Sequence, residues 1–246
     1  MSQAPGYMPY EPQLRPVQWS AGIWTVDGPE VAYRLSGMTI PCPTRMTVIR
    51  LADGSVWVHS PIACEPDLLA AIQAIGPVAA VIAPNTLHDL FFAAWAKACP
   101  DAALFASAGL SDAIADRPAT VLGDQPAAAW RDEIDVHVID LGTFVEAVFH
   151  HRASGTLIVT DLMQNFEARR VRNPIVRLIL MAGGATGPNG RPSIEIRFAA
   201  RRHRAALRRG VEQMLAWQPR SVILSHGLCY RENAMQEIER AFAWLD

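Results

Sequence analysis

Residues 78–89 read VAAVIAPNTLHD, and this stretch decides the fold prediction. Its first half, 78–83, is short and wholly apolar, which is typical of a strand that is buried on both faces. The second half becomes polar at once, with Asn85, His88 and Asp89 following the strand. In layered α/β folds, ligands bind where strands end and loops begin. The stretch therefore predicts a central strand that leads directly into a binding site.

Helical patterns lie on both sides of this strand. Residues 65–74 have apolar side chains at helical spacing, with Pro66 suited to the first turn, and residues 90–98 are also predicted to be helical. Farther along the chain, we predict strands at 103–106, 136–139, 146–150, 156–160 and 221–224, and helices at 111–115, 198–217 and 232–244. Strands that alternate with helices indicate a layered α/β architecture.

The beginning of the chain predicts consecutive strands instead. After an extended arm at 1–16, β-type runs are predicted at 22–26, 31–35, 46–51 and 56–59, with a turn at 27–29. The last two runs flank a loop that contains Asp53 and Gly54, which is a strong hairpin signal. This opening favours a mixed β-sandwich flanked by helices over a purely parallel sheet. No internal repeat is visible, so we predict one domain over residues 17–246.

Composition and charge narrow the class of protein. The chain has 246 residues, half of them apolar, so a sizeable core is expected. The formal net charge of −2 predicts no nucleic-acid or membrane partner. Four widely spaced cysteines without a CxxC pair, and an N-terminus without the pattern of a signal peptide, predict free thiols in the cytoplasm. No apolar run reaches the roughly 18 residues that a membrane span needs.

Polar or charged residues directly follow four of the apolar strands. They are His59, then Asn85 with His88 and Asp89, then Asp161, and finally His226. Histidine and aspartate are side chains that bind Zn²⁺ and Fe²⁺. Any one of them alone would more often be a hydrogen-bonded structural residue, or a helix N-cap in the case of Asp161. Because all of these residues follow strands, we predict that they share one polar pocket.

These segments resemble the metallo-β-lactamase superfamily over nearly the whole chain. The hairpin at 47–61 is similar to the strand pair that ends in that superfamily's Asp-Thr-Gly turn, here replaced by His59-Ser60-Pro61. Residues 155–161 are similar to the strand that ends in its metal-bridging aspartate, and residues 222–227 to the segment with its last metal histidine. The resemblance implies an αββα sandwich, with two mixed β-sheets flanked by helices. More narrowly, the chain resembles a divergent bacterial branch that carries a domain-of-unknown-function label.

The metal signature departs from that superfamily. Thr-His-x-His-x-Asp-His corresponds here to residues 83–89, so Pro84 and Thr86 replace two histidines of the first metal site. The third histidine of that site is missing from residues 141–145. The resemblance therefore implies that the first site is lost, because proline has no donor atom. The positions of the second site still hold donors, namely His88, Asp89, Asp161 and His226.

The retained donors imply one Zn or Fe ion and a mononuclear metal-dependent hydrolase of a small ester, thioester or lactone, with Asp161 also a candidate catalytic residue. A two-histidine, one-carboxylate set would equally suit a non-haem iron oxidoreductase. The alternative is a metal-free degenerate member that binds a small molecule or a protein through the old pocket. The oligomeric state is open, and a dimer is compatible with the sequence.

Several other residues are candidates for the same pocket. Glu146 and His150 are four residues apart on one strand and face the same side, so Glu146 is a candidate general base or substitute ligand, or both lie on a solvent face. Arg45 is a candidate partner for a substrate carboxylate. The arginines of residues 201–209 predict a solvated helix face, or a site for an anionic ligand or an acidic partner. Nucleic-acid binding is disfavoured because no aromatic platform accompanies them.

Overall fold

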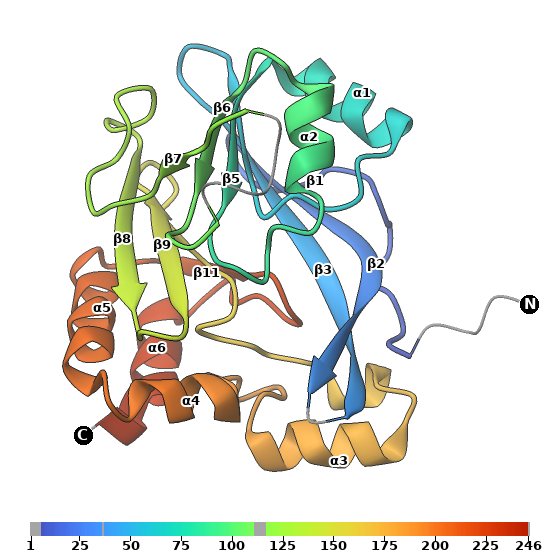
Figure 1. Cartoon of the computed structure of the whole chain (residues 1–246), viewed down its shortest axis with the longest axis vertical. Helices are drawn as coiled ribbons and strands as arrows, with labels where there is room; N and C mark the ends of the chain where they lie inside the picture. The colour runs from blue at the N-terminus through green and yellow to red at the C-terminus, as the bar shows by residue number, and fades with distance from the viewer. Residues whose placement is uncertain (1–5, 36, 111–116, 246) are drawn as a thin grey trace, which may run out of the picture.

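Two β-sheets face each other, and helices cover the outer face of each (Figure 1). The computed structural model describes residues 6–35, 37–110 and 117–245. The larger sheet contains, in order, β1 (Val17–Ser20), β2 (Ile23–Leu35), β3 (Met38–Arg50), β4 (Val56–His59), β5 (Val78–Ala83), β6 (Ala103–Ala106) and β7 (Thr120–Val121). The smaller sheet contains β11 (Ser221–Leu224), β10 (Thr156–Val159), β9 (Val145–His151) and β8 (Ile134–Asp140).

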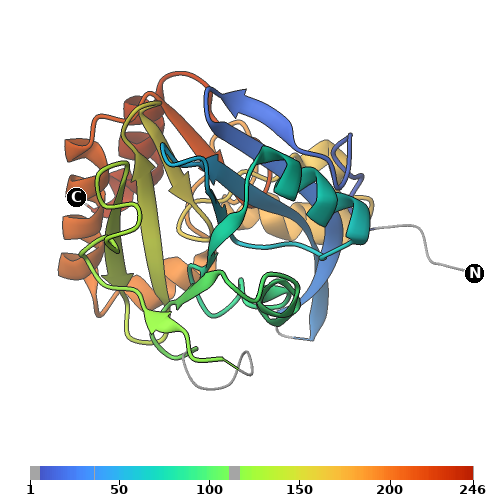
Figure 2. The same ribbon diagram turned by 90° about the horizontal axis from the view of Figure 1, so that it is seen from above.

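The helices lie outside the two sheets, on opposite sides when the molecule is seen from above (Figure 2). The larger sheet is covered by α1 (Pro66–Ile75) and α2 (Phe92–Ala98), and the smaller sheet by α4 (Ile194–Ala200), α5 (Arg204–Ala216) and α6 (Ala234–Phe242). The helix α3 (Pro174–Gly183) packs below the β2–β3 hairpin, and short 3-10 helices occupy Ala168–Arg170 and Ala243–Leu245. No helix in the described part of the chain could cross a membrane.

Both sheets are mixed, as the sequence predicts. The strands β1 to β4 form an antiparallel meander, whereas β4 to β7 are parallel. Parallel neighbours require crossover helices, so β5 is buried by helices on one face and by the second sheet on the other. Along β4 the side chains alternate, so that Val58 faces the helices while Trp57 and His59 face the space between the sheets.

The turn predicted at residues 27–29 is wrong. The strand β2 runs through this position, and its pairing with β3 shifts register between Gly28 and Val31. Pro29 and Glu30 together lie opposite a single residue of β3, which is the arrangement of a β-bulge. A bulge accommodates a proline because it leaves a backbone position unpaired. The long ladder with β3 therefore outweighs the local turn signal.

The single helix predicted at 198–217 is also wrong. The chain forms α4 and α5 with a turn at 201–203. Neither glycine nor proline occurs in this turn, so local sequence does not end α4. Both helices instead bury residues against the smaller sheet, Ala200 from α4 and Leu207 from α5, and the turn allows both contacts. The helix predicted at 111–115 lies outside the described residues.

The described part of the N-terminal arm, residues 6–16, lies against the body of the protein. Tyr7 is buried and forms a β-bridge with Val171. The backbone N–H groups of Gly6 and Tyr7 donate to the Glu30 carboxylate at 2.8 and 2.6 Å. The four cysteines are free thiols in this structure. The prediction that the sandwich body at residues 17–246 is one domain stays a prediction.

Candidate metal centre

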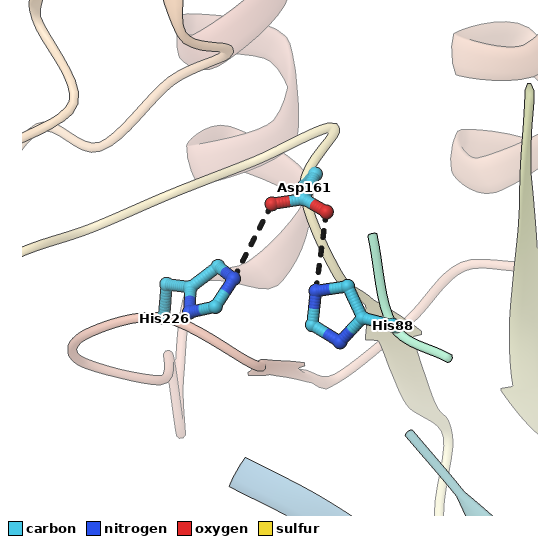
Figure 3. A group of neighbouring side chains, drawn as sticks. All are labelled: His88, Asp161 and His226. Atoms are coloured by element: carbon cyan, nitrogen blue, oxygen red, sulfur yellow. Dashed lines mark ion pairs between the residues drawn. The ribbon is translucent and has the colours of Figure 1, made fainter. Parts of the chain in front are cut away.

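Three side chains from three different loops converge at one edge of the sandwich. His88 follows β5, Asp161 follows β10, and His226 follows β11 (Figure 3). The His88 Nε2 atom lies 3.1 Å from Asp161 Oδ2, and the His226 Nε2 atom lies 3.3 Å from Asp161 Oδ1. One donor atom from each residue falls within 4.8 Å of the others. These are three of the four ligands that the sequence predicts.

The orientation of His226 is set by the larger sheet. Its Nδ1 atom donates a hydrogen bond to the carbonyl oxygen of Pro43 in β3 at 2.7 Å. This bond directs Nε2 toward Asp161 and leaves its lone pair free when the ring is neutral. Arg45 holds the same turn, because its guanidinium donates to the carbonyl oxygens of Leu224 at 2.6 Å and Gly227 at 2.7 Å.

Arg45 therefore lies behind the site instead of in the cavity. The side chain is buried and forms an ion pair with Asp27 at 2.7 Å. Its donors are used by these partners and by the Cys229 sulfur at 3.2 Å. The substrate-binding role suggested for Arg45 stays a prediction, and the contacts that the structure shows support the His226 turn.

The orientation of His88 is set by Ser60. The Ser60 hydroxyl is hydrogen bonded to His88 Nδ1 at 2.6 Å, so Nε2 is the ring nitrogen that faces Asp161. Ser60 stands at the end of β4 with a φ of 53°, a left-handed conformation that turns the chain toward the site. In each histidine, Nδ1 is thus hydrogen bonded to a polar group of the protein, as is usual for metal-binding histidines.

The Asp161 loop is held by two fully buried residues, Glu146 and Asn85. The Glu146 carboxylate accepts hydrogen bonds from the backbone N–H groups of Thr160 and Asp161, both at 2.8 Å, and of Leu162 at 3.1 Å. The Asn85 side-chain amide donates to Thr160 Oγ1 at 2.9 Å, to Asp161 Oδ2 at 2.9 Å and to Glu146 at 3.1 Å. Together they fix the position of the Asp161 carboxylate.

Charges in this region are strongly coupled. Burial would raise the pKa of Asp161, but the His88 charge and the hydrogen bonds to both histidines outweigh it, so the pKa lies well below its ordinary value. Burial and the neighbouring Asp161 charge raise the pKa of Glu146 to about 7. Burial lowers the pKa of His226, but its hydrogen bond to Asp161 and the charge of that carboxylate raise the pKa overall. A divalent ion would therefore compete with a proton on His226.

A cavity of about 290 Å³ opens in front of the three residues. Most of its wall is apolar and comes from Val31, Tyr33, Ile62, Leu87, Phe91, Phe144 and Ile196. Polar groups come mainly from Ser60, Thr143, Gln164 and Glu195. No lysine or arginine is among the described residues that line it. The cavity is therefore suited to an uncharged, partly apolar molecule whose polar group reaches the cluster at its floor.

The structure places other predicted site residues elsewhere. Asp89 is not part of the cluster. His59 points between the sheets, where its ring stacks on Trp57 at 5.4 Å. His150 lies at the far end of β9, about 13 Å along the strand from Glu146, with its Nδ1 atom 3.2 Å from Asp135. Neither histidine lines the cavity.

Two residues at the site were not predicted. Gln164 lines the cavity and donates to Asp161 Oδ1 at 3.0 Å, and no feature of the sequence singles it out. Ser60 could have been found from the alternation of side chains along β4. Trp57 and His59 both point into the space between the sheets, so Ser60 points the other way, toward the cavity.

These three residues offer one donor atom each for a divalent metal ion. Ligand atoms about 2.0–2.2 Å from a tetrahedral Zn²⁺ are separated by roughly 3.3 Å. His88 Nε2 lies 3.1 Å from Asp161 Oδ2 and His226 Nε2 lies 3.3 Å from the other oxygen, Oδ1, so each imidazole is at about this distance from one carboxylate oxygen. Two imidazoles and one carboxylate suit either Zn²⁺ or Fe²⁺. The hydrogen bonds at Nδ1 of both rings also favour metal binding, because they leave both Nε2 atoms to face the ion.

Comparison with solved structures identifies the fold. A metallo-β-lactamase from Pontibacter korlensis matches with a TM-score of 0.61 and 12% identity, over 94% of this chain and 98% of that chain. FIM-1 from Pseudomonas aeruginosa, a metallo-β-lactamase in its mono-zinc form, matches with a TM-score of 0.60 and 10% identity, over 99% and 97%. Rubredoxin oxygen:oxidoreductase from Desulfovibrio gigas matches with a TM-score of 0.66 and 12% identity, over 94% of this chain and 61% of that chain.

Comparison of sequences identifies the family. No curated protein matches the chain. A family model described as a domain of unknown function (DUF4336) matches residues 21–178, which is more than half of the sequence. The chain therefore belongs to the DUF4336 family and has the metallo-β-lactamase fold.

Proposed function

We propose that this protein is a mononuclear metal-dependent hydrolase of a small, uncharged ester, thioester or lactone. The observation that carries the proposal is the convergence of His88, Asp161 and His226 at the floor of a largely apolar cavity. Bound there, a Zn²⁺ or Fe²⁺ ion would supply Lewis acidity toward a carbonyl oxygen and a water molecule. Three protein ligands leave coordination positions open for such molecules.

The protein's own groups would position the reactants. Pro43 and Ser60 hold the two imidazoles so that their Nε2 atoms face the same point. Glu146 acts as a positioning residue, because its carboxylate holds the backbone of the Asp161 loop and does not line the cavity. Gln164, which lies in the cavity and donates to Asp161, is available to orient a substrate oxygen. The apolar wall would exclude bulk water and hold the acyl part of the substrate.

A second candidate function is metal-free binding of a small molecule. It is favoured by one observation: both oxygens of Asp161 already have histidine partners, so the cluster is electrostatically satisfied without an ion. The same two-histidine, one-carboxylate set would also serve an iron-dependent oxidoreductase. Bound Zn²⁺ would exclude the oxidative function, because this ion has no redox chemistry, whereas bound iron would require an assay of hydrolysis to separate the two.

Elemental analysis of protein purified without added metal tests the proposal. We expect about one Zn or Fe per chain, and a lower melting temperature after chelation. His226→Ala should lose the metal and any esterase activity. The matched control is His137→Ala, which removes a histidine paired with Asp124 at 3.1 Å outside the cavity and should keep the metal. Metal-free wild-type protein with a melting temperature insensitive to chelators would refute the proposal and leave the binding function.

A further inference from the structure

One end of the molecule exposes apolar side chains on two neighbouring helices. Among the described residues, six large apolar side chains are more than half exposed, and five of them lie on α3 and α4. These five are Ile175, Leu178 and Met181 on α3, and Ile194 and Phe198 on α4. We call them the α3–α4 surface. The helices adjoin, because the Arg197 guanidinium donates to the Gly183 carbonyl oxygen at 2.6 Å (Figure 1).

The helix α3 is apolar on both of its faces. Val176 and Leu180 are buried under the β2–β3 hairpin, whereas Ile175 and Leu178 on the opposite face are 66% and 67% exposed. A helix that is apolar all round is normally covered on every side. Contiguous exposed apolar surface on a soluble protein commonly marks a contact with a partner or a membrane. The α3–α4 surface therefore requires a partner other than the rest of this chain.

The charges around this surface indicate what the partner is. Residues 171–204 contain seven arginines and one acidic residue, Glu195, although the whole chain has a net charge of −2. Within the described residues, none of these seven arginines forms an ion pair with a carboxylate of the protein. Arg201 lies over the ring of Phe198 at 5.2 Å, so a cation and an exposed apolar group are side by side. Exposed apolar side chains among arginines complement a surface that is anionic outside and apolar beneath.

A second copy of the chain fits this surface poorly. A twofold symmetric contact would place the surface against itself, and the arginines of one copy would then face those of the other. The five side chains also project from the helices, and none of them lines the cavity. Projecting apolar groups insert between lipids, and surrounding arginines reach the phosphates. We propose that the α3–α4 surface docks this protein on an anionic phospholipid bilayer, in contrast to the prediction of no membrane partner from the net charge of the whole chain.

Docking of this kind would bring the cavity close to the lipid. Its lining includes Leu87, Leu90 and Glu195, which are exposed and therefore surround its mouth. Leu90 is the sixth apolar side chain that is more than half exposed. The helix α4 lines the cavity with Ile196 and Ala199 and carries Phe198 on its outer side. An apolar molecule could thus pass between bilayer and cavity, and the docking itself does not depend on a metal.

Flotation of the full-length protein with vesicles tests the proposal. We expect binding to vesicles of equimolar phosphatidylcholine and phosphatidylglycerol, little binding to phosphatidylcholine alone, and weaker binding as salt is raised. Leu178→Ser and Phe198→Ser should each weaken partitioning about tenfold. Arg201→Gln and Arg202→Gln should each weaken it about fivefold. The matched controls are Val121→Ser and Arg131→Gln, which change exposed residues outside α3 and α4 and should bind like wild type.

Several results would overturn the proposal. They are no binding to the anionic vesicles, equal binding to both compositions, or unchanged binding of all four surface variants. A dimer in sedimentation experiments that Phe198→Ser converts to monomer would assign the surface to a second copy instead. Circular dichroism shows whether each serine variant folds. If one does not, the arginine variants decide the question, because Arg201 and Arg202 are exposed in a turn.

Discussion

Replacing His59 should make the protein less sensitive to acid. The imidazole is 1% exposed, stacks on Trp57 and meets the edge of the Phe149 ring at 5.3 Å. Neither ring nitrogen has a hydrogen-bond partner among the described residues. Burial, together with the charge of His88, lowers the pKa of His59 to about 3. We therefore predict that His59→Leu, which conserves volume approximately, removes a pH-dependent cost of folding.

The size of the effect follows from proton linkage. An unfolded histidine has a pKa of about 6.5, so between about pH 6.5 and pH 3 the unfolded chain binds a proton at this position that the folded chain does not. Above about pH 6.5 neither state binds this proton, so the free energy of unfolding is not reduced. As the pH falls below about 6.5, proton binding to the unfolded chain lowers the free energy of unfolding. Between pH 7 and pH 5 the loss integrates to about 2 kcal/mol. The leucine variant should lose about 2 kcal/mol less than wild type over the same interval.

Urea denaturation of both proteins at pH 7 and pH 5 measures this difference. Comparing the two pH values cancels the packing changes that the substitution introduces at either one. His203→Leu, which removes a partly exposed histidine outside the core, is the control and should leave the wild-type pH dependence in place. Equal losses for wild type and His59→Leu would refute the reasoning, because they would show that His59 accepts a proton in the folded state.

Three further predictions concern the site. Glu146→Gln should lower the free energy of unfolding by about 1–3 kcal/mol in urea denaturation, because an NH₂ group would then face a backbone N–H donor of the Asp161 loop. Ser60→Ala should weaken metal binding about 10–100-fold in competition with a chromophoric chelator, because His88 loses the group that orients its ring. Asp89→Asn should keep the metal while Asp161→Asn loses it in elemental analysis, because only Asp161 belongs to the cluster.

The first two of these predictions have matched controls, and in the third Asp89→Asn serves as the control for Asp161→Asn. Glu239→Gln changes an exposed carboxylate and should leave stability unchanged. Ser154→Ala removes a hydroxyl that is bonded to His151 Nδ1 at 2.9 Å away from the site, and it should not affect metal binding. Metal loss in Asp89→Asn would restore Asp89 as a ligand. Wild-type affinity in Ser60→Ala would show that His88 is oriented by other contacts.

Most of the fold was predictable because its signals are local. The apolar run of β5 and the turn that joins β3 to β4 were predicted at their observed positions, although β3 begins at Met38 and its predicted run only at residue 46. The helix α3 was not predicted, although Asn173 and Pro174 before its apolar run are typical of a helix N-terminus. The bulge in β2 and the break between α4 and α5 depend on contacts with β3 and with the smaller sheet.

The sequence by itself determined which kinds of donor stand at the strand ends, because residue type and strand period are local properties. Only the tertiary structure decided which of them meet. His88 reaches Asp161 and Asp89 does not join the cluster, although the two are neighbours in one loop. Glu146 and Arg45, which resemble reactive groups in the sequence, support the loops of Asp161 and His226 from behind. The physical reason is that a buried charge is placed by its hydrogen-bond partners, and those partners come from distant parts of the chain.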